Sequence, residues 1–180
     1  MKKNLMKLID VTDEHIELIY NWRNQPNIRS VMYDSEPINW DKHVAWFNAV
    51  LKNDMKYVKI FIYNQVPYGV GNFSLKDKKN GIGEWGFYIG EQNAPKGMGT
   101  ALAYKMLEYI FEDLNIRKLC AEVLEFNEKS IRFHEKVGFQ KEGILREHVY
   151  LNNCYCNIHL FSYFKKDWNK SKTQLEKYFN

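Results

Sequence analysis

Apolar positions recur along the chain in two patterns, short runs of strand length and a helical spacing of three to four residues, which alternate from segment to segment. Apolar runs of strand length predict seven strands, at 8–11, 57–63, 68–75, 82–89, 117–124, 144–151 and 155–164. Apolar residues at helical spacing predict helices at 13–24, 42–52, 100–114 and 127–137, and a helix or frayed tail at 168–179. This mixture predicts an α/β (α+β) class, with one domain over 1–165 and a C-terminal helix or tail over 166–180.

Breaker residues predict where several elements end. The first helix stops near Asn24, because the residue before Pro26 is disfavoured in a helix, and a loop follows. Gly138 ends the helix at 127–137, and Asn152-Asn153 predicts a hairpin turn. His43 falls on the first turn of its helix, where a histidine is more often solvated or capping than catalytic.

Glycines surround the strand at 82–89. Gly86 and Gly90 predict a bulge or a close backbone approach. Gly97 and Gly99 lie between this strand and the helix at 100–114, and a glycine turn before a helix N-terminus favours an anion site. The order therefore indicates a cradle for a phosphate-bearing cofactor; the alternative is a Gly-rich turn before a buried helix. A right-handed crossover through that helix would make the strands at 82–89 and 117–124 parallel.

Composition and charge exclude several classes of protein. The chain has 180 residues, 45% hydrophobic and 27% charged, as in ordinary globular proteins. The net charge is +4 and much of it lies in the last sixteen residues, which argues against a nucleic-acid-binding face. No apolar run is long enough for a membrane span or a signal peptide. Three cysteines give neither a zinc site nor a disulfide framework, so we expect no metal, reduced thiols and a cytoplasmic location.

A second stretch, Asn127 to Phe139, reads NEKSIRFHEKVGF. Together with Ala94 to Gly99, it resembles the two cofactor-binding motifs of the GCN5-related N-acetyltransferases (GNAT), although Ala94 replaces the usual Gln or Arg. The resemblance implies the GNAT fold, a mixed central sheet of about seven strands with flanking helices and a splayed cofactor cleft. It also implies acetyl-coenzyme A (acetyl-CoA) as the donor. The implied cofactor contacts are Phe87, Tyr88, Ile89, Lys96, Gly97, Met98, Gly99, Thr100, Asn127 and Ser130.

The segment NWRNQPN at 21–27 resembles a subgroup that acetylates nucleotide-linked amino sugars. That subgroup includes the enzyme of pseudaminic acid biosynthesis, whose acceptor is a UDP-linked 4-amino-4,6-dideoxy sugar. By resemblance, the acceptor would contact Arg23, Asn24, Arg29, Met32, Tyr33 and His43. Guanidinium and aromatic groups suit a nucleotide sugar. The alternative is that Arg23 pairs with a carboxylate and Tyr33 packs, and for Trp22 a core position is favoured.

Acetyl transfer to an amine needs a base and a way to accept the leaving thiolate. Glu84 is the candidate base, directly or through water; the alternative is an exposed carboxylate at a strand end. Many relatives carry Tyr where this chain has His134, which could protonate the thiolate if charged, or could instead pack or contact the cofactor. Cys120 lacks an obvious His partner, so we expect direct attack in a ternary complex. The resemblance places thioester recognition on the backbone of 87–89, where an N–H would stabilise an oxyanion.

Two other functions stay open at this point. Acetyltransferases of protein N-termini, such as those acting on ribosomal proteins, share both motifs. A domain that binds acyl-CoA without turnover gains weight if Glu84 and His134 lie far from the thioester. A homodimer through the aromatic final strands is also a hypothesis.

Overall fold

The computed structural model describes residues 1–151 and 153–179. Its centre is a seven-stranded sheet in the order β1-β2-β3-β4-β5-β7-β6. The strands are β1 (Met6–Asp10), β2 (Lys56–Tyr63), β3 (Val66–Asp77), β4 (Ile82–Ile89), β5 (Lys118–Leu124), β6 (Gln140–Leu151) and β7 (Cys154–Phe164). Neighbouring strands are antiparallel except β4 and β5, which are parallel. The seven predicted strands and the parallel pair are confirmed.

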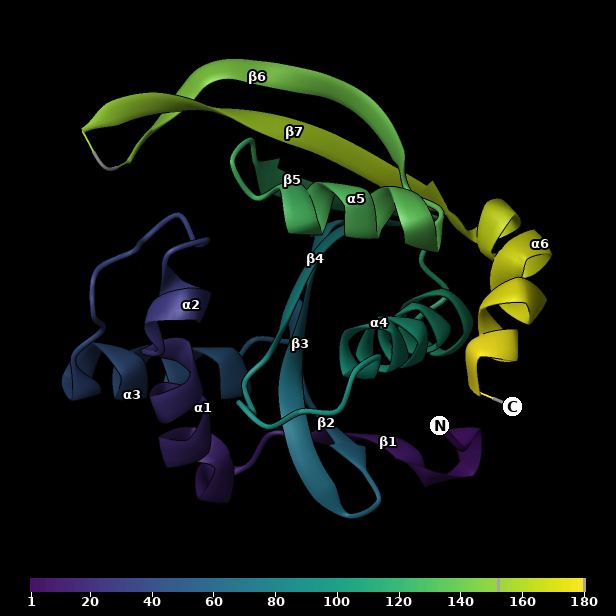
Figure 1. Ribbon diagram of the computed structural model, residues 1–180, viewed down its shortest axis with the longest axis horizontal. Coiled ribbons are helices and arrows are strands. Elements are labelled where there is room, and N and C mark those ends of the chain that lie inside the picture. Colours follow the sequence, from purple (N-terminus) through teal and green to yellow (C-terminus); the bar gives the residue numbers. More distant parts are fainter. Residues whose placement is uncertain (152, 180) are drawn as a thin grey trace.

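Helices cover both faces of this sheet. They are α1 (Ile16–Arg23), α2 (Pro26–Arg29), α3 (Trp40–Leu51), α4 (Met98–Glu108), α5 (Glu128–Val137) and α6 (Lys165–Glu176). Helices α1 to α3 lie on one side of β2–β4, and α4 lies on the other (Figure 1). Two large cores follow: α4, α5 and α6 pack on one face around Phe73 and Ala121, and α1 and α3 pack on the other around Val70. A third, smaller core lies around Ile158 of β7. In the described part of the chain, no helix is both long and apolar enough to span a membrane.

Several helix ends follow from local chemistry. Asn127 caps α5 by accepting a hydrogen bond from the Ser130 N–H at 3.1 Å. Gly138 closes α5 with a φ of 112°, as predicted. Two predictions need correction. The helix expected from residue 100 begins at Met98 and ends in a π-helical turn, Tyr109–Asp113. The loop expected after Pro26 opens with the short helix α2, because proline suits the first helical position.

The sheet opens between β4 and β5. These strands pair only over Ile82–Glu84, opposite Lys118–Cys120, and then diverge within the described residues. The splayed cleft that the resemblance implied is therefore present. Gly90 is a close approach, as predicted, but Gly86 is neither a bulge nor a close approach. Its pairing with Asn72 is regular, and a Cβ there would meet no atom within 4 Å.

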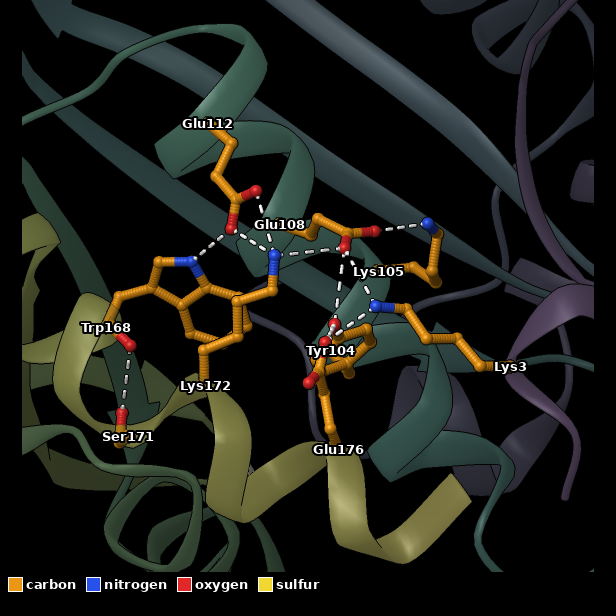
Figure 2. Close-up of polar contacts among 9 residues, drawn as sticks. All are labelled: Lys3, Tyr104, Lys105, Glu108, Glu112, Trp168, Ser171, Lys172 and Glu176. Carbon is orange, nitrogen blue, oxygen red and sulfur yellow. Dashed lines mark hydrogen bonds and ion pairs between the residues drawn. The ribbon is translucent and has the colours of Figure 1, made fainter. Parts of the chain in front are cut away.

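The segment after residue 165 packs into the main core as α6. Trp168 is fully buried and its indole N–H donates to Glu112 of the π-helical turn at 2.8 Å. Figure 2 shows the polar contacts beside it, in which Tyr104 of α4 donates to Glu176 at 2.6 Å. Lys3 donates to the same carboxylate at 2.7 Å. The expected C-terminal helix is thus an integral layer of the fold rather than a frayed tail.

The long hairpin β6–β7 forms the far edge of the sheet (Figure 1). Leu151 pairs with Cys154, as the predicted hairpin requires. Of the two turn residues, Asn153 has a φ of 63°, and Asn152 lies outside the described residues.

Candidate functional site

The glycine loop between β4 and α4 is the segment predicted to form an anion cradle. Gly97 has a φ of 99°, which turns the chain into α4. Met98 N–H donates to the Pro95 carbonyl at 3.3 Å and Ala101 N–H donates to Gly97 at 3.0 Å. Between them, the N–H groups of Gly99 and Thr100 have no acceptor among the described residues. They therefore remain available for an anion at the helix N-terminus.

Gly99 leaves room for such a ligand. A Cβ built on it would meet nothing closer than Ile89 Cγ1 at 4.0 Å, so the protein's own packing does not require a glycine there. The same ligand could continue along 85–89 of β4, because this edge lies beyond the part paired with β5. The predicted cofactor residues Phe87, Tyr88 and Ile89 thus lie on an open strand edge leading from the glycine loop, where Lys96 is exposed.

Helix α5 follows β5, the second of the two diverging strands, and its Phe133 packs against Phe87 of β4. The side-chain oxygen of Asn127 is used as the helix cap. The backbone carbonyl of Ser130 accepts from His134 Nδ1 at 2.8 Å. Asn127 and Ser130 therefore hold the start of the helix and the His134 ring in place.

His134 is buried in an aromatic setting. Its ring lies 5.0 Å from that of Phe139 and stacks on Phe161 at 5.6 Å. Burial lowers the pKa of His134, and the bond to the Ser130 carbonyl opposes this only in part. Nδ1 carries the proton, because a carbonyl only accepts. The ring is neutral near pH 7, so the structure favours packing over the charged acid considered from sequence.

A cavity of about 270 Å³ opens on the other face of the sheet, between α1, α3 and β3–β4. Three predicted acceptor residues, Arg23, Met32 and His43, line it, together with Asn72 and Tyr88, Trp46, Lys42 and two isoleucines. Burial raises the pKa of Tyr88, so its hydroxyl stays protonated, although nearby Arg23 acts in the opposite direction. A larger, shallow hollow of about 500 Å³ lies on α6 and the turn after it, and includes none of the predicted site residues.

Two residues that line the 270 Å³ cavity each carry a buried side-chain atom with no partner among the described residues. Arg23 Nη1 and Asn72 Oδ1 are both buried and unpaired. Arg23 is anchored through Nη2, which donates to the Asp34 carbonyl at 3.0 Å. The wall of the cavity therefore contains one unpaired donor and one unpaired acceptor, and unpaired buried groups of this kind are costly unless a ligand satisfies them.

The other predicted acceptor residues do not line this cavity. Asn24 exchanges two hydrogen bonds with the backbone of Ile38, and Arg29 donates to the Ser35 carbonyl at 3.0 Å. These contacts shape the loop at 30–39. The expectation that His43 is solvated or capping is wrong, since it is 2% exposed and donates from Nε2 to the Ile16 carbonyl at 2.8 Å. Burial lowers its pKa.

Two carboxylates lie beside the splayed strands. Glu84 of β4 pairs with Lys76 at 2.8 Å and is about one third exposed. Glu122 of β5 accepts a hydrogen bond from Tyr33, which raises the pKa of that phenol, as does its burial. Cys120, opposite Glu84, has its thiol pKa raised by burial, which fits the expectation that it is no nucleophile.

Asn72, Trp46 and Glu122 were missed from the sequence. Only for Glu122 was there a usable signal: it lies two residues after Cys120, on the strand expected to run parallel to that of Glu84. Within residues 1–151 and 153–179, no group of three or more His, Cys, Asp or Glu side chains comes together as metal ligands.

Comparison with known proteins gives the family. The sequence profile described as "Acetyltransferase (GNAT) domain" matches residues 6–140. The "Uncharacterized N-acetyltransferase p20" of Bacillus licheniformis is 30% identical over 100 residues, 56% of this chain and 56% of p20. The chain thus matches about half the length of p20. The acetyltransferase PseH of Campylobacter jejuni is 27% identical over 135 residues, 75% of this chain and 83% of PseH.

Among solved structures, spermidine N-acetyltransferase from Vibrio cholerae in complex with CoA and spermine has a TM-score of 0.84 at 21% identity. The match covers 92% of this chain and 99% of that one. At this identity the likeness establishes the fold, and the predicted mixed seven-stranded fold with flanking helices is confirmed.

Proposed function

Because the chain belongs to the GNAT acetyltransferase family, we propose that it transfers an acetyl group from acetyl-CoA to the amine of a nucleotide-linked 4-amino-4,6-dideoxy sugar. The observation that carries this proposal is the pair of unpaired buried atoms, Arg23 Nη1 and Asn72 Oδ1. A sugar hydroxyl accepts one hydrogen bond and donates another, so it matches both. The acetyltransferase PseH of Campylobacter jejuni is among the relatives.

The charge of the cavity favours a nucleotide sugar over a polyamine as the acceptor. Arg23 and Lys42 line it, and no carboxylate is among its lining residues. A polycation such as spermine would be repelled there, whereas the phosphates of a nucleotide sugar would be attracted. The structural likeness to spermidine N-acetyltransferase therefore does not extend to the acceptor in this proposal.

The glycine loop suits the donor. The free N–H groups of Gly99 and Thr100 would hold the pyrophosphate, with Gly97, Lys96 and the backbone of Met98 around them. The open edge of β4 at 87–89 would hold the pantetheine arm, with Asn127 and Ser130 closing the cleft. When bound, acetyl-CoA supplies the activated acyl group.

The chain's own residues would then handle the protons. Glu84 accepts a proton from the attacking amine, directly or through a water molecule, and Lys76 holds the carboxylate in place at 2.8 Å. Glu122, held by Tyr33, faces the same space and completes an acidic wall for the amine. His134 is buried and neutral, so in this proposal the departing thiolate takes its proton from solvent water.

The test is release of CoA thiol with three acceptors offered separately: a UDP-linked 4-amino sugar, N-terminal peptides of ribosomal proteins, and spermidine. Turnover with the sugar alone supports the proposal. The N-terminal peptide is the second candidate, because Glu84 and Glu122 form a carboxylate pair that suits a cationic amine. Turnover with peptides or spermidine alone rejects the sugar and keeps the family.

A further inference from the structure

Neither the backbone conformation nor the packing of the protein requires a glycine at position 86. Its φ is not positive, since the positive-φ glycines of the described chain are Gly81, Gly97 and Gly138. Its pairing with Asn72 is regular, and a Cβ on it would meet nothing within 4 Å. A glycine inside a strand costs about 0.5–1 kcal/mol relative to alanine. The open space above Gly86 therefore points to a ligand.

The neighbours of Gly86 identify what that ligand would be. Side chains alternate along a strand, so Glu84, Gly86 and Tyr88 share one face of β4. Tyr88 and the paired residue Asn72 line the 270 Å³ cavity, and Glu84 is the proposed base. The space over Gly86 thus lies between the cavity and the carboxylate.

We propose that Gly86 determines acceptor specificity. The body of the acceptor fills the cavity, and the carbon bearing its amine lies over the Gly86 backbone, so that the amine reaches Glu84. A side chain at position 86 would fill the space between the cavity and Glu84, and would keep the amine away from that carboxylate. This inference rests on the proposed function for the location of the acceptor, but not for its identity.

The test is a graded series, Gly86→Ala and Gly86→Val. We expect both variants to unfold at the wild-type temperature or above it, because alanine and valine suit a strand better than glycine. We expect acetyl-CoA binding, measured by calorimetry, to stay within about twofold of wild type. For the acceptor, kcat/KM falls with side-chain size, by about 100-fold for valine, since a displacement of about 1 Å costs that much. Gly143→Val is the matched control, because a Cβ at Gly143 on β6 also meets nothing within 4 Å.

Wild-type kcat/KM for the acceptor in Gly86→Val overturns the inference, and so does an equal loss of acetyl-CoA binding. The series uses whichever amine the wild type acetylates, so rejection of the sugar leaves this test intact. If no amine is acetylated, the open space is probed by alkylation. Gly86→Cys, in a background without the three native cysteines, is expected to react with iodoacetamide about as fast as Gly143→Cys. A blocked thiol at position 86 overturns the inference.

Discussion

The indole ring of Trp22 occupies the space that a side chain at position 90 would need. A Cβ on Gly90 would lie 2.1 Å from Trp22 Cδ2. Gln25 adds a second link, because its Nε2 donates to the Gly90 carbonyl at 2.8 Å. The end of α1 is thereby fixed on the end of β4, and this contact sets the position of Arg23 in the cavity wall.

Gly90→Ala should lower the free energy of unfolding by about 1–3 kcal/mol, the usual cost of overpacking. Urea unfolding at neutral pH measures it. The matched control is Gly86→Ala on the same strand, which should lose nothing because its side chain enters open space. Equal losses at both positions would show that the Trp22 contact is not the cause.

Gly99→Val should weaken acetyl-CoA binding by at least about tenfold, or about 1.4 kcal/mol, because its side chain fills the space in front of the free N–H groups. Calorimetry with acetyl-CoA measures the loss. Its thermal unfolding should stay within a degree or two of wild type, on the order of 0.5 kcal/mol. Gly97→Ala should instead destabilise the fold, because its φ of 99° is strained for alanine. Unchanged binding in Gly99→Val would remove the cradle from the proposed site.

Glu84→Gln should lower kcat by about 10²–10³, the usual contribution of a general base, and leave the KM for acetyl-CoA near its wild-type value. Steady-state rates with a saturating acceptor measure it. Glu128→Gln is the control, since Glu128 is an exposed carboxylate paired with Arg132 on α5. A loss of less than about fivefold would transfer the role to Glu122 or to water.

His134 should make the fold less stable in mild acid. Burial lowers its pKa below the usual value of 6.5, so the unfolded chain binds the proton more readily. The free energy of unfolding should therefore fall as the pH drops below about 6.5. In His134→Gln this slope should be smaller, with His43 and His159, whose pKa values are also lowered, supplying the remainder. Urea titrations at pH 7.5 and 5.5 compare the two. Identical slopes would contradict the buried neutral ring.

Glu108 should contribute stability near neutral pH through α6 and the N-terminal segment. Burial alone would raise its pKa, but ion pairs with Lys105 and Lys3 outweigh it and lower the pKa to about 2. A depressed carboxyl pKa stabilises the fold above the usual value of 4.5, and this contribution is lost as the pH falls from 4.5 towards 2.

Glu108→Gln should therefore cost on the order of 2 kcal/mol at pH 7, and the difference from wild type should shrink below pH 4.5. Urea titrations at pH 7 and pH 3.5 measure both values. Glu128→Gln, in an exposed pair, should cost less than about 0.5 kcal/mol at either pH. A constant difference across this range would mean that the loss comes from packing.

The sequence predicted the features that depend on neighbours along the chain. The strand periods, the stop at Gly138 and the glycine turn before α4 are all local signals, and each was confirmed. The anion cradle at Gly99 stays a prediction, which the sequence could make because its residues are contiguous.

Features that depend on distant partners could not be predicted. Asn72 is an ordinary polar residue in a strand until pairing brings it beside Gly86 and Tyr88. The aromatic setting of His134 could not be seen from the sequence, because three of the five rings around it come from β4 and β7. They belong to Trp85, Phe87 and Phe161. The other two rings, of Phe133 and Phe139, come from its own helix and the turn after it. Tyr33 was expected at the acceptor from resemblance, but its hydrogen bond to Glu122, 89 residues away in the chain, could not be predicted.

The short contact between β4 and β5 has a mechanical consequence. Only three residues of β4, at 82–84, pair with β5 in the described chain. They join one part of the sheet, β1–β4, to the other part, β5–β7, and the segment containing α4 is the covalent connection. Such a short pairing can act as a hinge, and a molecule bound between the diverging strands would contact both parts of the sheet. Donor binding would then make the whole sheet more rigid. The angle between the two parts of the sheet, rather than any single side chain, would set how close the acceptor comes to the acyl group.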